Sequence, residues 1–229
     1  MVSSAPVSAT LQPPGATLTG ACGVLIPAYN EAATVASVVE VALGAALGPV
    51  LVVDDGSNDA TAERALAAGA AVLRLRDNQG KGGAVHAGAE RLETGVTVLL
   101  DADLVGLTPQ HVRDLAAPVL EGKLEMTRGT FTGGRWRTTA AQQITPQLNG
   151  QRAILREHLL SVPGLRGSRY GVEIAITDQA KRARWRAADV ALHDVSQVMK
   201  EEKRGWLRGV RIRLGMYRDI LRTWLRTWQ

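Results

Sequence analysis

Four short polar segments, three of them at the end of an apolar run, constrain the fold of this chain more than any other feature. They are IPAYNE (26–31), VVDDGSND (52–59), NQGKGGA (78–84) and LLDADL (99–104). In open α/β sheets, ligands bind at the carboxyl ends of the strands. Because the segments recur at the spacing of strand–helix units, we expect them to meet at one site, suited to a phosphorylated ligand and a metal ion.

The periodicity between these segments alternates between strand and helix. We expect strands over 23–27, 50–53, 71–75 and 96–100. We expect helices from Asn30 or Thr34 to about 47, from Asn58 or Asp59 to about 68, and over 81–92 and 109–120. This alternation predicts an α/β fold with a mostly parallel sheet flanked by helices. Beyond residue 121 the regular alternation of strand and helix patterns ends. There the sequence predicts a strand within 125–139, helices over 151–160 and 172–180, and a strand over 184–192.

The chain of 229 residues divides into three parts by composition. Residues 1–20 are rich in Ser, Ala, Pro and Thr and predict a flexible tail, and residues 21–200 predict one domain. Residues 201–229 predict a basic amphipathic helix, because eight of the last 27 residues are Lys or Arg and one is acidic. Its apolar stripe consists of Trp206, Leu207, Val210, Leu214, Tyr217, Leu221, Trp224, Leu225 and Trp228.

Three surfaces fit such a helix. It can lie in a membrane interface, or it can pack on the domain or on a second copy in a homodimer. The chain has no run of about 18 apolar residues, so we expect no spanning helix. A single cysteine, Cys22, fits a reducing, cytoplasmic compartment, with peripheral contact at the inner membrane face if the helix binds lipid. We expect no nucleic-acid partner, because the basic residues circle one helix without a recognisable binding fold.

Asp101, Ala102 and Asp103 follow a predicted strand directly. Two carboxylates one residue apart can hold a hard divalent cation, which prefers oxygen ligands and often bridges substrate phosphates. The alternative is that they cap a helix. Asp55 ends a second strand and can bind a base or ribose, or serve only a turn.

The glycine-rich turn at 80–83 carries Lys81. Backbone N–H groups and an ammonium at a helix N-terminus can bind phosphate. The turn is not a Walker A loop, because no Ser or Thr follows the lysine. No G-x-G-x-x-G turn follows the first strand, which argues against a nicotinamide or flavin dehydrogenase.

In this order, PAYNE, VVDDGSND, NQGKGGA and DAD resemble the nucleotide-sugar-binding half of family 2-type glycosyltransferases with the GT-A fold. The resemblance implies a nucleoside pocket lined by Pro27, Ala28, Tyr29 and Glu31, with Asp55 on the base or ribose. It implies that Lys81 approaches the diphosphate, and that Asp101, Ala102 and Asp103 bind it together with Mg²⁺ or Mn²⁺.

The second half resembles a narrower group. The segments LNGQRA (148–153) and YGVEIA (170–175) are similar to glucosyl-3-phosphoglycerate synthases, which are retaining enzymes, and similar second halves occur in dolichyl-phosphate-sugar-synthase-like proteins. The Glu-Asp pair of the common inverting pattern is missing here. The resemblance implies that His193 is a third metal ligand, beside Asp101 and Asp103, and that Glu173 orients the acceptor.

Each candidate site residue in the second half of the chain also has a purely structural interpretation. Glu173 can pair with Arg152 or Arg169, and His193 can be an ordinary structural histidine. Arg166 and Arg169 can bind an acceptor phosphate or be solvated, and residues 129–134 can form a closing loop or a surface hairpin.

The resulting hypothesis is a metal-dependent hexosyltransferase in which Glu173 and Asp103 are the catalytic candidates. The donor would be a nucleoside diphosphate sugar, with UDP favoured, and the acceptor a phosphorylated small molecule or a polyprenyl phosphate. One alternative is a sugar nucleotidyltransferase, but its glycine-rich loop would directly follow the first strand. The other is a non-catalytic nucleotide-sugar-binding or membrane-associated scaffold, which would have little use for both DAD and His193.

Overall fold

The computed structural model describes residues 7–11, 17–132, 149–168 and 171–197. An eight-stranded sheet with the order β1-β4-β3-β2-β5-β8-β7-β9 forms the centre of the molecule. Its parallel half consists of β2 (Thr19–Ala28), β3 (Val50–Asp54), β4 (Ala71–Leu75) and β5 (Glu93–Leu99). The carboxyl ends of these strands lie at one edge of the sheet, as the alternation of strands and helices predicts.

The rest of the sheet mixes directions. Strand β8 (Arg152–Leu155) runs antiparallel between β5 and β7 (Met126–Thr132), and β9 (Ala187–His193) runs parallel to β7. At the opposite edge, β1 (Val7–Leu11) pairs antiparallel with β4. The mostly parallel, helix-flanked fold class is confirmed.

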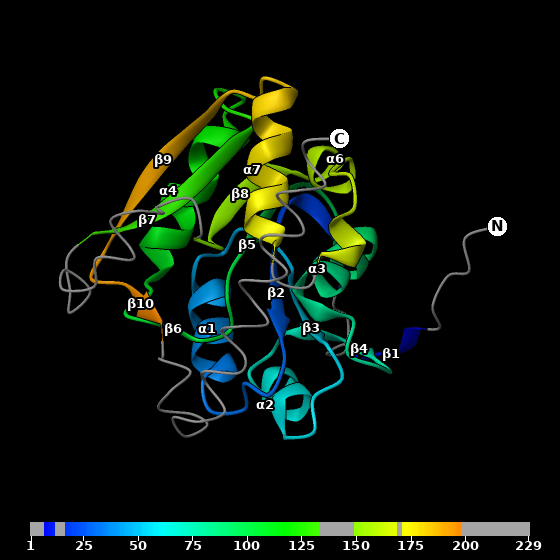
Figure 1. Ribbon diagram of the computed structural model, residues 1–229. Helices are drawn as coiled ribbons and strands as arrows, with labels where there is room; N and C mark the ends of the chain where they lie inside the picture. The colour runs from blue at the N-terminus through cyan, green and yellow to red at the C-terminus, as the bar shows by residue number, and fades with distance from the viewer. Residues whose placement is uncertain (1–6, 12–16, 133–148, 169–170, 198–229) are drawn as a thin grey trace, which may run out of the picture.

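Helices cover both faces of the sheet (Figure 1). One face packs against α1 (Val35–Gly44), α2 (Thr61–Ala67) and α4 (Pro109–Leu120). The other packs against α3 (Gly80–Arg91), α6 (Arg156–Leu160) and α7 (Val172–Arg182). Strand β2 serves both cores, because alternate side chains point to opposite faces: Val24 and Ile26 join the first core and Leu25 the second.

A second, two-stranded sheet follows the DAD segment. Strand β6 (Leu104–Val105) pairs antiparallel with β10 (Ser196–Gln197), so the end of the described chain lies beside the turn at 101–103. Gly106 permits this close approach, because a Cβ at this position would lie only 2.3 Å from the carbonyl oxygen of Asp194. Gly106 also has a φ of 79°, which favours glycine.

Two expectations about elements need correction. The helix expected over 151–160 is wrong in its first half, where Arg152–Leu155 form a strand and only Arg156–Leu160 are helical. The tail expected over 1–20 is wrong in part, because Val7–Leu11 pair with β4 and β2 already begins at Thr19.

The amphipathic helix expected over 201–229 lies outside the described residues. Within the described ranges, no helix is long and apolar enough to cross a membrane.

Candidate active site at the carboxyl edge of the sheet

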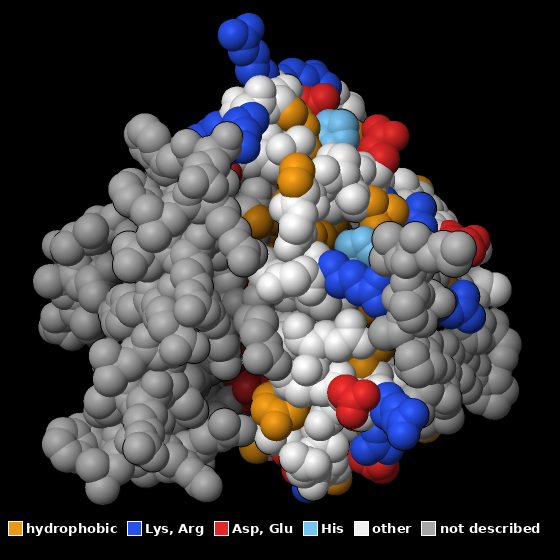
Figure 2. Space-filling view, turned by 45° about the vertical axis from the view of Figure 1, so that its right-hand side comes forward, with side chains coloured by type: hydrophobic (Ala, Val, Ile, Leu, Met, Phe, Trp, Pro, Cys, Tyr) orange, Lys and Arg blue, Asp and Glu red, His pale blue; other side chains and the backbone are white. Residues whose placement is uncertain are grey.

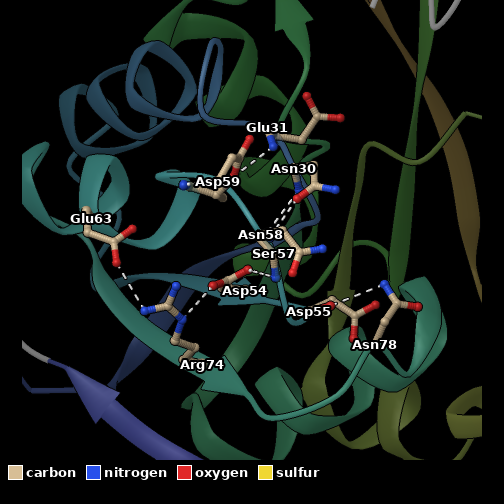
Figure 3. Close-up of polar contacts among 11 residues, drawn as sticks. Asn30, Glu31, Asp54, Asp55, Ser57, Asn58, Asp59, Glu63, Arg74 and Asn78 are labelled. Carbon is tan, nitrogen blue, oxygen red and sulfur yellow. Dashed lines mark hydrogen bonds and ion pairs between the residues drawn. The ribbon is translucent and has the colours of Figure 1, made fainter. Parts of the chain in front are cut away.

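The loops that follow β2 and β3 are hydrogen-bonded to each other (Figure 3). The backbone N–H of Asn30 donates to Ser57 Oγ at 2.9 Å, and Asn30 Oδ1 accepts from the N–H of Asn58 at 2.9 Å. The N–H of Glu31 donates to Thr61 Oγ1 at 2.8 Å. These bonds fix the backbone of the segment that the resemblance assigns to the nucleoside pocket.

Within that segment the side chains differ in exposure. Ala28 is buried, Pro27 and Glu31 are partly buried, and Tyr29 is 38% exposed. The exposed ring of Tyr29 is therefore accessible for stacking on a base, whereas Ala28 belongs to the core.

Asp54, the last residue of β3, is fully buried and held by its neighbours. Its Oδ2 lies 3.1 Å from Arg74 Nε, and its Oδ1 accepts from the N–H of Ser57 at 2.9 Å. Arg74 also pairs with Glu63 at 3.1 Å (Figure 3). Asp54 is thus linked to β4 through Arg74, and Arg74 in turn links β4 to α2.

Asp55 binds the N-terminus of α3 with both carboxylate oxygens. Oδ1 accepts from the N–H of Gln79 at 2.7 Å and Oδ2 from that of Gly80 at 2.8 Å. A carboxylate here satisfies N–H groups that have no partner within the helix and complements the helix dipole. Asp55 therefore positions α3 and the Lys81 that follows, while its contact with a base or ribose stays a prediction.

Lys81 lies between two carboxylates from distant parts of the chain. Its Nζ is 2.5 Å from Asp101 Oδ1 and 2.5 Å from Glu173 Oε1. Asp101 follows β5, and Glu173 is in the first turn of α7. The structure thus brings together three of the residues that the sequence predicts for the site, one from each of three segments.

Arg152 completes a group of two cations and two anions. It is fully buried at the start of β8, and its Nη2 donates to the backbone carbonyl of Glu173 at 3.1 Å. Together with Lys81, Asp101 and Glu173, it lines a small pocket at the carboxyl edge of the sheet. The pairing of Glu173 with Arg152 that the sequence allowed is present, but through the main chain of Glu173.

The pKa values of the two cations move in opposite directions. Burial acts to lower the pKa of Lys81, but attraction to Asp101 and Glu173 outweighs it, and the pKa lies above its usual value. Burial lowers the pKa of Arg152 to about 10, against the opposing attraction of Glu173. Both side chains are therefore positively charged at neutral pH.

Two glutamines that the sequence did not single out hold the other oxygen of Asp101. Gln151 Nε2 donates to Asp101 Oδ2 at 2.9 Å, and Gln197 Nε2 donates to the same atom at 2.6 Å. Gly150 allows this crowding, because a Cβ there would lie 2.6 Å from Asp101 Oδ2 and 2.7 Å from Lys81 Nζ. Gln151 stands within the LNGQRA segment, whereas no sequence pattern indicates Gln197.

The three predicted metal ligands are not assembled into one cluster. Among the described residues, no group of three or more His, Cys, Asp and Glu side chains could hold a metal ion. Asp103 is partly buried beside Asp101, and Ala102 between them is buried. His193 ends β9 with its Nδ1 2.9 Å from Thr132 Oγ1. The two aspartates offer the oxygen ligands that Mg²⁺ and Mn²⁺ prefer.

The glycines of the NQGKGGA segment have a packing role. A Cβ on Gly82 would lie 2.2 Å from the carbonyl oxygens of Leu165 and Ser168, and the N–H of Gly82 donates to Ser168 O at 2.9 Å. Helix α3 thus lies against the 3₁₀ helix η3 (Leu165–Gly167). The close contact, in addition to any phosphate, explains the need for glycine at 82.

Most of the other residues that the sequence suggests for the acceptor side lie outside the described residues. Arg166 is exposed in η3, and Arg169, Tyr170 and residues 133–148 lie outside the described residues. Residues 129–132 belong to β7, so that part of the expected loop or hairpin is a strand of the main sheet. On the face shown in Figure 2, basic and acidic side chains of the described surface are interspersed.

Comparison with known proteins identifies the class. The chain belongs to glycosyltransferase family 2, whose family model matches residues 23–186. This family assignment agrees with the parallel sheet and with the polar segments at its carboxyl edge.

Among characterised relatives, the glucosyl-3-phosphoglycerate synthase of Mycolicibacterium smegmatis is 31% identical over 188 residues, covering 67% of this chain and 61% of the relative. The synthase of Mycobacterium tuberculosis H37Rv is 29% identical, covering 67% and 58%. Glycosyltransferase AglJ of Haloferax volcanii is 32% identical over 170 residues, covering 66% and 55%. The chain therefore spans about three fifths of the length of these relatives.

Solved structures of the Mycobacterium tuberculosis synthase share the fold. One, in complex with Mn²⁺, UDP and phosphoglyceric acid, has a TM-score of 0.72 at 27% identity and covers 97% of this chain and 86% of that chain. Another, with Mn²⁺, UDP-glucose and phosphoglyceric acid, has a TM-score of 0.70 at 29% identity and covers 90% and 78%. A further structure of that synthase contains Mg²⁺ and UDP.

Proposed function

We propose that the protein transfers a hexose from a UDP-sugar, with UDP-glucose favoured, to a small phosphorylated acceptor in the presence of Mg²⁺ or Mn²⁺. The family membership supports glycosyl transfer, and the ligands of the similar synthase support this donor, metal and acceptor class. The transfer breaks the bond between the sugar C1 and the diphosphate and forms one to an acceptor hydroxyl oxygen, and the hydroxyl proton leaves with the departing diphosphate or to solvent.

The position of Lys81 carries the proposal. Its ammonium lies between Asp101, at the end of the donor half, and Glu173, in the acceptor half. The leaving group is a nucleoside diphosphate on which negative charge develops. A fixed cation aimed at that charge lowers the barrier, because it is already oriented before the reaction. A diphosphate would replace the carboxylates as partners of Lys81.

A bound divalent cation would supply further charge stabilisation at the diphosphate. Asp101 and Asp103 are the residues proposed to hold it. His193 is proposed as a third ligand, since Thr132 binds its Nδ1, and metal-binding imidazoles are commonly oriented through the second ring nitrogen.

The acceptor side is assigned to Glu173 and Arg152. Glu173 is nearly buried at the N-terminus of α7, with its backbone carbonyl bonded to Arg152. A carboxylate in this position can accept a hydrogen bond from an acceptor or sugar hydroxyl once Lys81 turns to phosphate. The relatives favour a small phosphorylated acceptor over a polyprenyl phosphate. The polyprenyl-phosphate hypothesis depends on the amphipathic helix expected over 201–229, which lies outside the described residues.

The test is a UDP-release assay with mass analysis of the product. UDP-glucose and Mn²⁺ are supplied with 3-phosphoglycerate, with unphosphorylated glycerate, or with a polyprenyl phosphate in detergent. We expect UDP release and a hexosylated product with the small phosphorylated acceptor. Lys81→Met should lose at least tenfold in rate, because a charge-stabilising contact in a transition state is worth a few kcal/mol.

Lys123→Met is the matched control, because the side chain of Lys123 is exposed and its ammonium pairs with Glu121 rather than with a residue of the site. Its rate should equal that of the wild type. Product formation only with the polyprenyl phosphate would contradict the proposed acceptor, and UDP release unaffected by Lys81→Met would contradict the proposed site.

A further inference from the structure

We propose that Gln197 is a positioning residue that holds the carboxylate of Asp101 and thereby raises the affinity of the site for a divalent cation. This inference rests on the proposed function, since it concerns the same metal. It adds to the site a residue that lies 96 positions along the chain from its partner.

The first support is the convergence of two amides on one oxygen. Gln197 Nε2 and Gln151 Nε2 both donate to Asp101 Oδ2, at 2.6 and 2.9 Å. The other oxygen, Oδ1, faces Lys81. A carboxylate with one oxygen held by two donors cannot rotate freely about its last torsion, so the direction of Oδ1 is fixed.

The orientation of Gln151 shows that this arrangement has a cost. Gln151 is fully buried, and its Oε1 has no hydrogen-bond partner within the described part of the chain. An unsatisfied buried oxygen destabilises the folded state, because it has lost its hydrogen bonds to water. The amide cannot turn around to relieve this, because a carboxylate only accepts hydrogen bonds and the NH₂ group must face Asp101.

The short β6–β10 ladder places Gln197 beside Asp101. The two-residue ladder of β6 and β10 pairs Gln197 with Leu104, which directly follows the 101–103 turn. Gly106 permits the close approach of Asp194, just before β10. His193 and Gln197 are therefore carried by one short segment. The ladder fixes the position of the amide, whereas His193 is placed by the pairing of β9 with Thr132 of β7.

The physical consequence concerns affinity. A carboxylate that is already oriented loses less conformational freedom when it binds a cation. Removal of residues that orient metal ligands typically costs 10–100-fold in metal affinity. Because Gln197 is partly exposed in a short ladder, its substitution should change the site more than the fold.

The experiment compares Gln197→Ala and Gln197→Glu with the wild type in the full chain. Mn²⁺ affinity is measured from the EPR signal of free Mn²⁺, and the melting temperature is recorded with and without Mn²⁺. Gln110→Ala and Gln110→Glu are the matched controls, because Gln110 Nε2 donates to Asp114 Oδ1 at 2.7 Å on the exposed face of α4.

We expect Gln197→Ala to weaken Mn²⁺ binding about tenfold or more. Gln197→Glu keeps the shape of the side chain but sets a second carboxylate against Asp101. Its metal-free form should melt several degrees lower, because like charges at this distance repel. Mn²⁺ should raise its melting temperature by more than that of the wild type, since a cation neutralises the pair. The Gln110 variants should show neither effect.

Unchanged Mn²⁺ affinity in Gln197→Ala would overturn the inference and leave the proposed function intact. A metal-free Gln197→Glu protein with the same melting temperature as the wild type would also overturn the inference. Failure of the wild type itself to bind Mn²⁺, alone or with UDP, would overturn the proposed function and this inference together.

Discussion

At the scale of single residues, the ammonium group of Lys81 balances two carboxylates that would otherwise face each other. Asp101 and Glu173 have side chains only 14% and 11% exposed, so water screens them poorly. Charge attraction to both, with the hydrogen bonds adding to it, explains why the pKa of Lys81 is raised in spite of burial. A ligand that draws Lys81 away must therefore offer at least comparable negative charge, as a diphosphate does.

Lys81→Met should destabilise the unliganded protein by about 3 kcal/mol, since removing one partner of a buried ion pair leaves charge without compensation. The pKa of one of the two carboxyls should rise in the variant. The folded form would then bind more protons than the unfolded form, so the loss of stability should shrink as the pH falls. Urea unfolding at pH 7 and pH 5 measures both effects.

Lys123→Met serves as the control in this measurement too, because Lys123 is 73% exposed and surface pairs contribute little. A loss of stability in Lys81→Met that is small, or that grows at lower pH, would contradict the proposed balance of charge around Lys81.

At the scale of elements, the packing of α3 against η3 decides where Lys81 lies. Ala for Gly inside a helix normally stabilises it by about 1 kcal/mol. Gly82→Ala should instead destabilise the protein by about 2 kcal/mol, as overpacking does, because its Cβ would lie 2.2 Å from two carbonyl oxygens. Chemical denaturation measures the change in the free energy of unfolding.

Gly167→Ala is the matched control for Gly82→Ala. It lies in η3, and nothing lies within 4 Å of where its Cβ would be, so its effect should stay within about 0.5 kcal/mol. A stabilised Gly82→Ala protein would mean that η3 does not contact α3 as described.

Glu125, the residue before β7, is hydrogen-bonded to Arg186, the residue before β9. Its Oε2 accepts from the N–H of Arg186 at 2.7 Å. This bond, followed by contact with His158, lowers the pKa of Glu125 in spite of partial burial. A depressed pKa contributes stability above the unfolded value near 4.5, and that contribution is lost as the pH falls through the folded value.

Glu125→Gln should therefore cost about 1 kcal/mol at pH 7, and the difference from the wild type should shrink at pH 4. Urea unfolding at the two pH values measures this. Glu40→Gln, on the exposed face of α1, should show no such change. An equal deficit for Glu125→Gln at both pH values would show that the charge of Glu125 contributes nothing.

The elements differ in how well the sequence predicts them. The apolar runs of β3 and β4 are bounded by polar turns, so their positions follow from pattern alone. The segment 152–155 does not alternate, because Arg152, Ala153 and Ile154 are all buried between two neighbouring strands. A short buried run has the same pattern in a helix as in a strand, and only the neighbours in the sheet decide between them.

At the scale of the whole molecule, the site joins two halves of the chain. The donor-side residues Lys81 and Asp101 follow from local motifs and from the rule that ligands lie at strand ends. The contacts of Gln151 and Gln197 with Asp101 depend on the long-range pairing of β8 with β5 and of β10 with β6, which no local pattern encodes. The role of Asp55 as a cap of α3 likewise depends on how two loops meet in space.

The most direct test of the central claim is UDP binding by isothermal titration calorimetry, with and without Mn²⁺, in the wild type and in Asp103→Asn. The account predicts that Mn²⁺ strengthens UDP binding to the wild type at least tenfold, and that Asp103→Asn removes this gain while keeping the fold. UDP binding that is absent, or that does not depend on Mn²⁺ in either protein, would contradict a metal-dependent nucleotide-sugar site at this edge of the sheet.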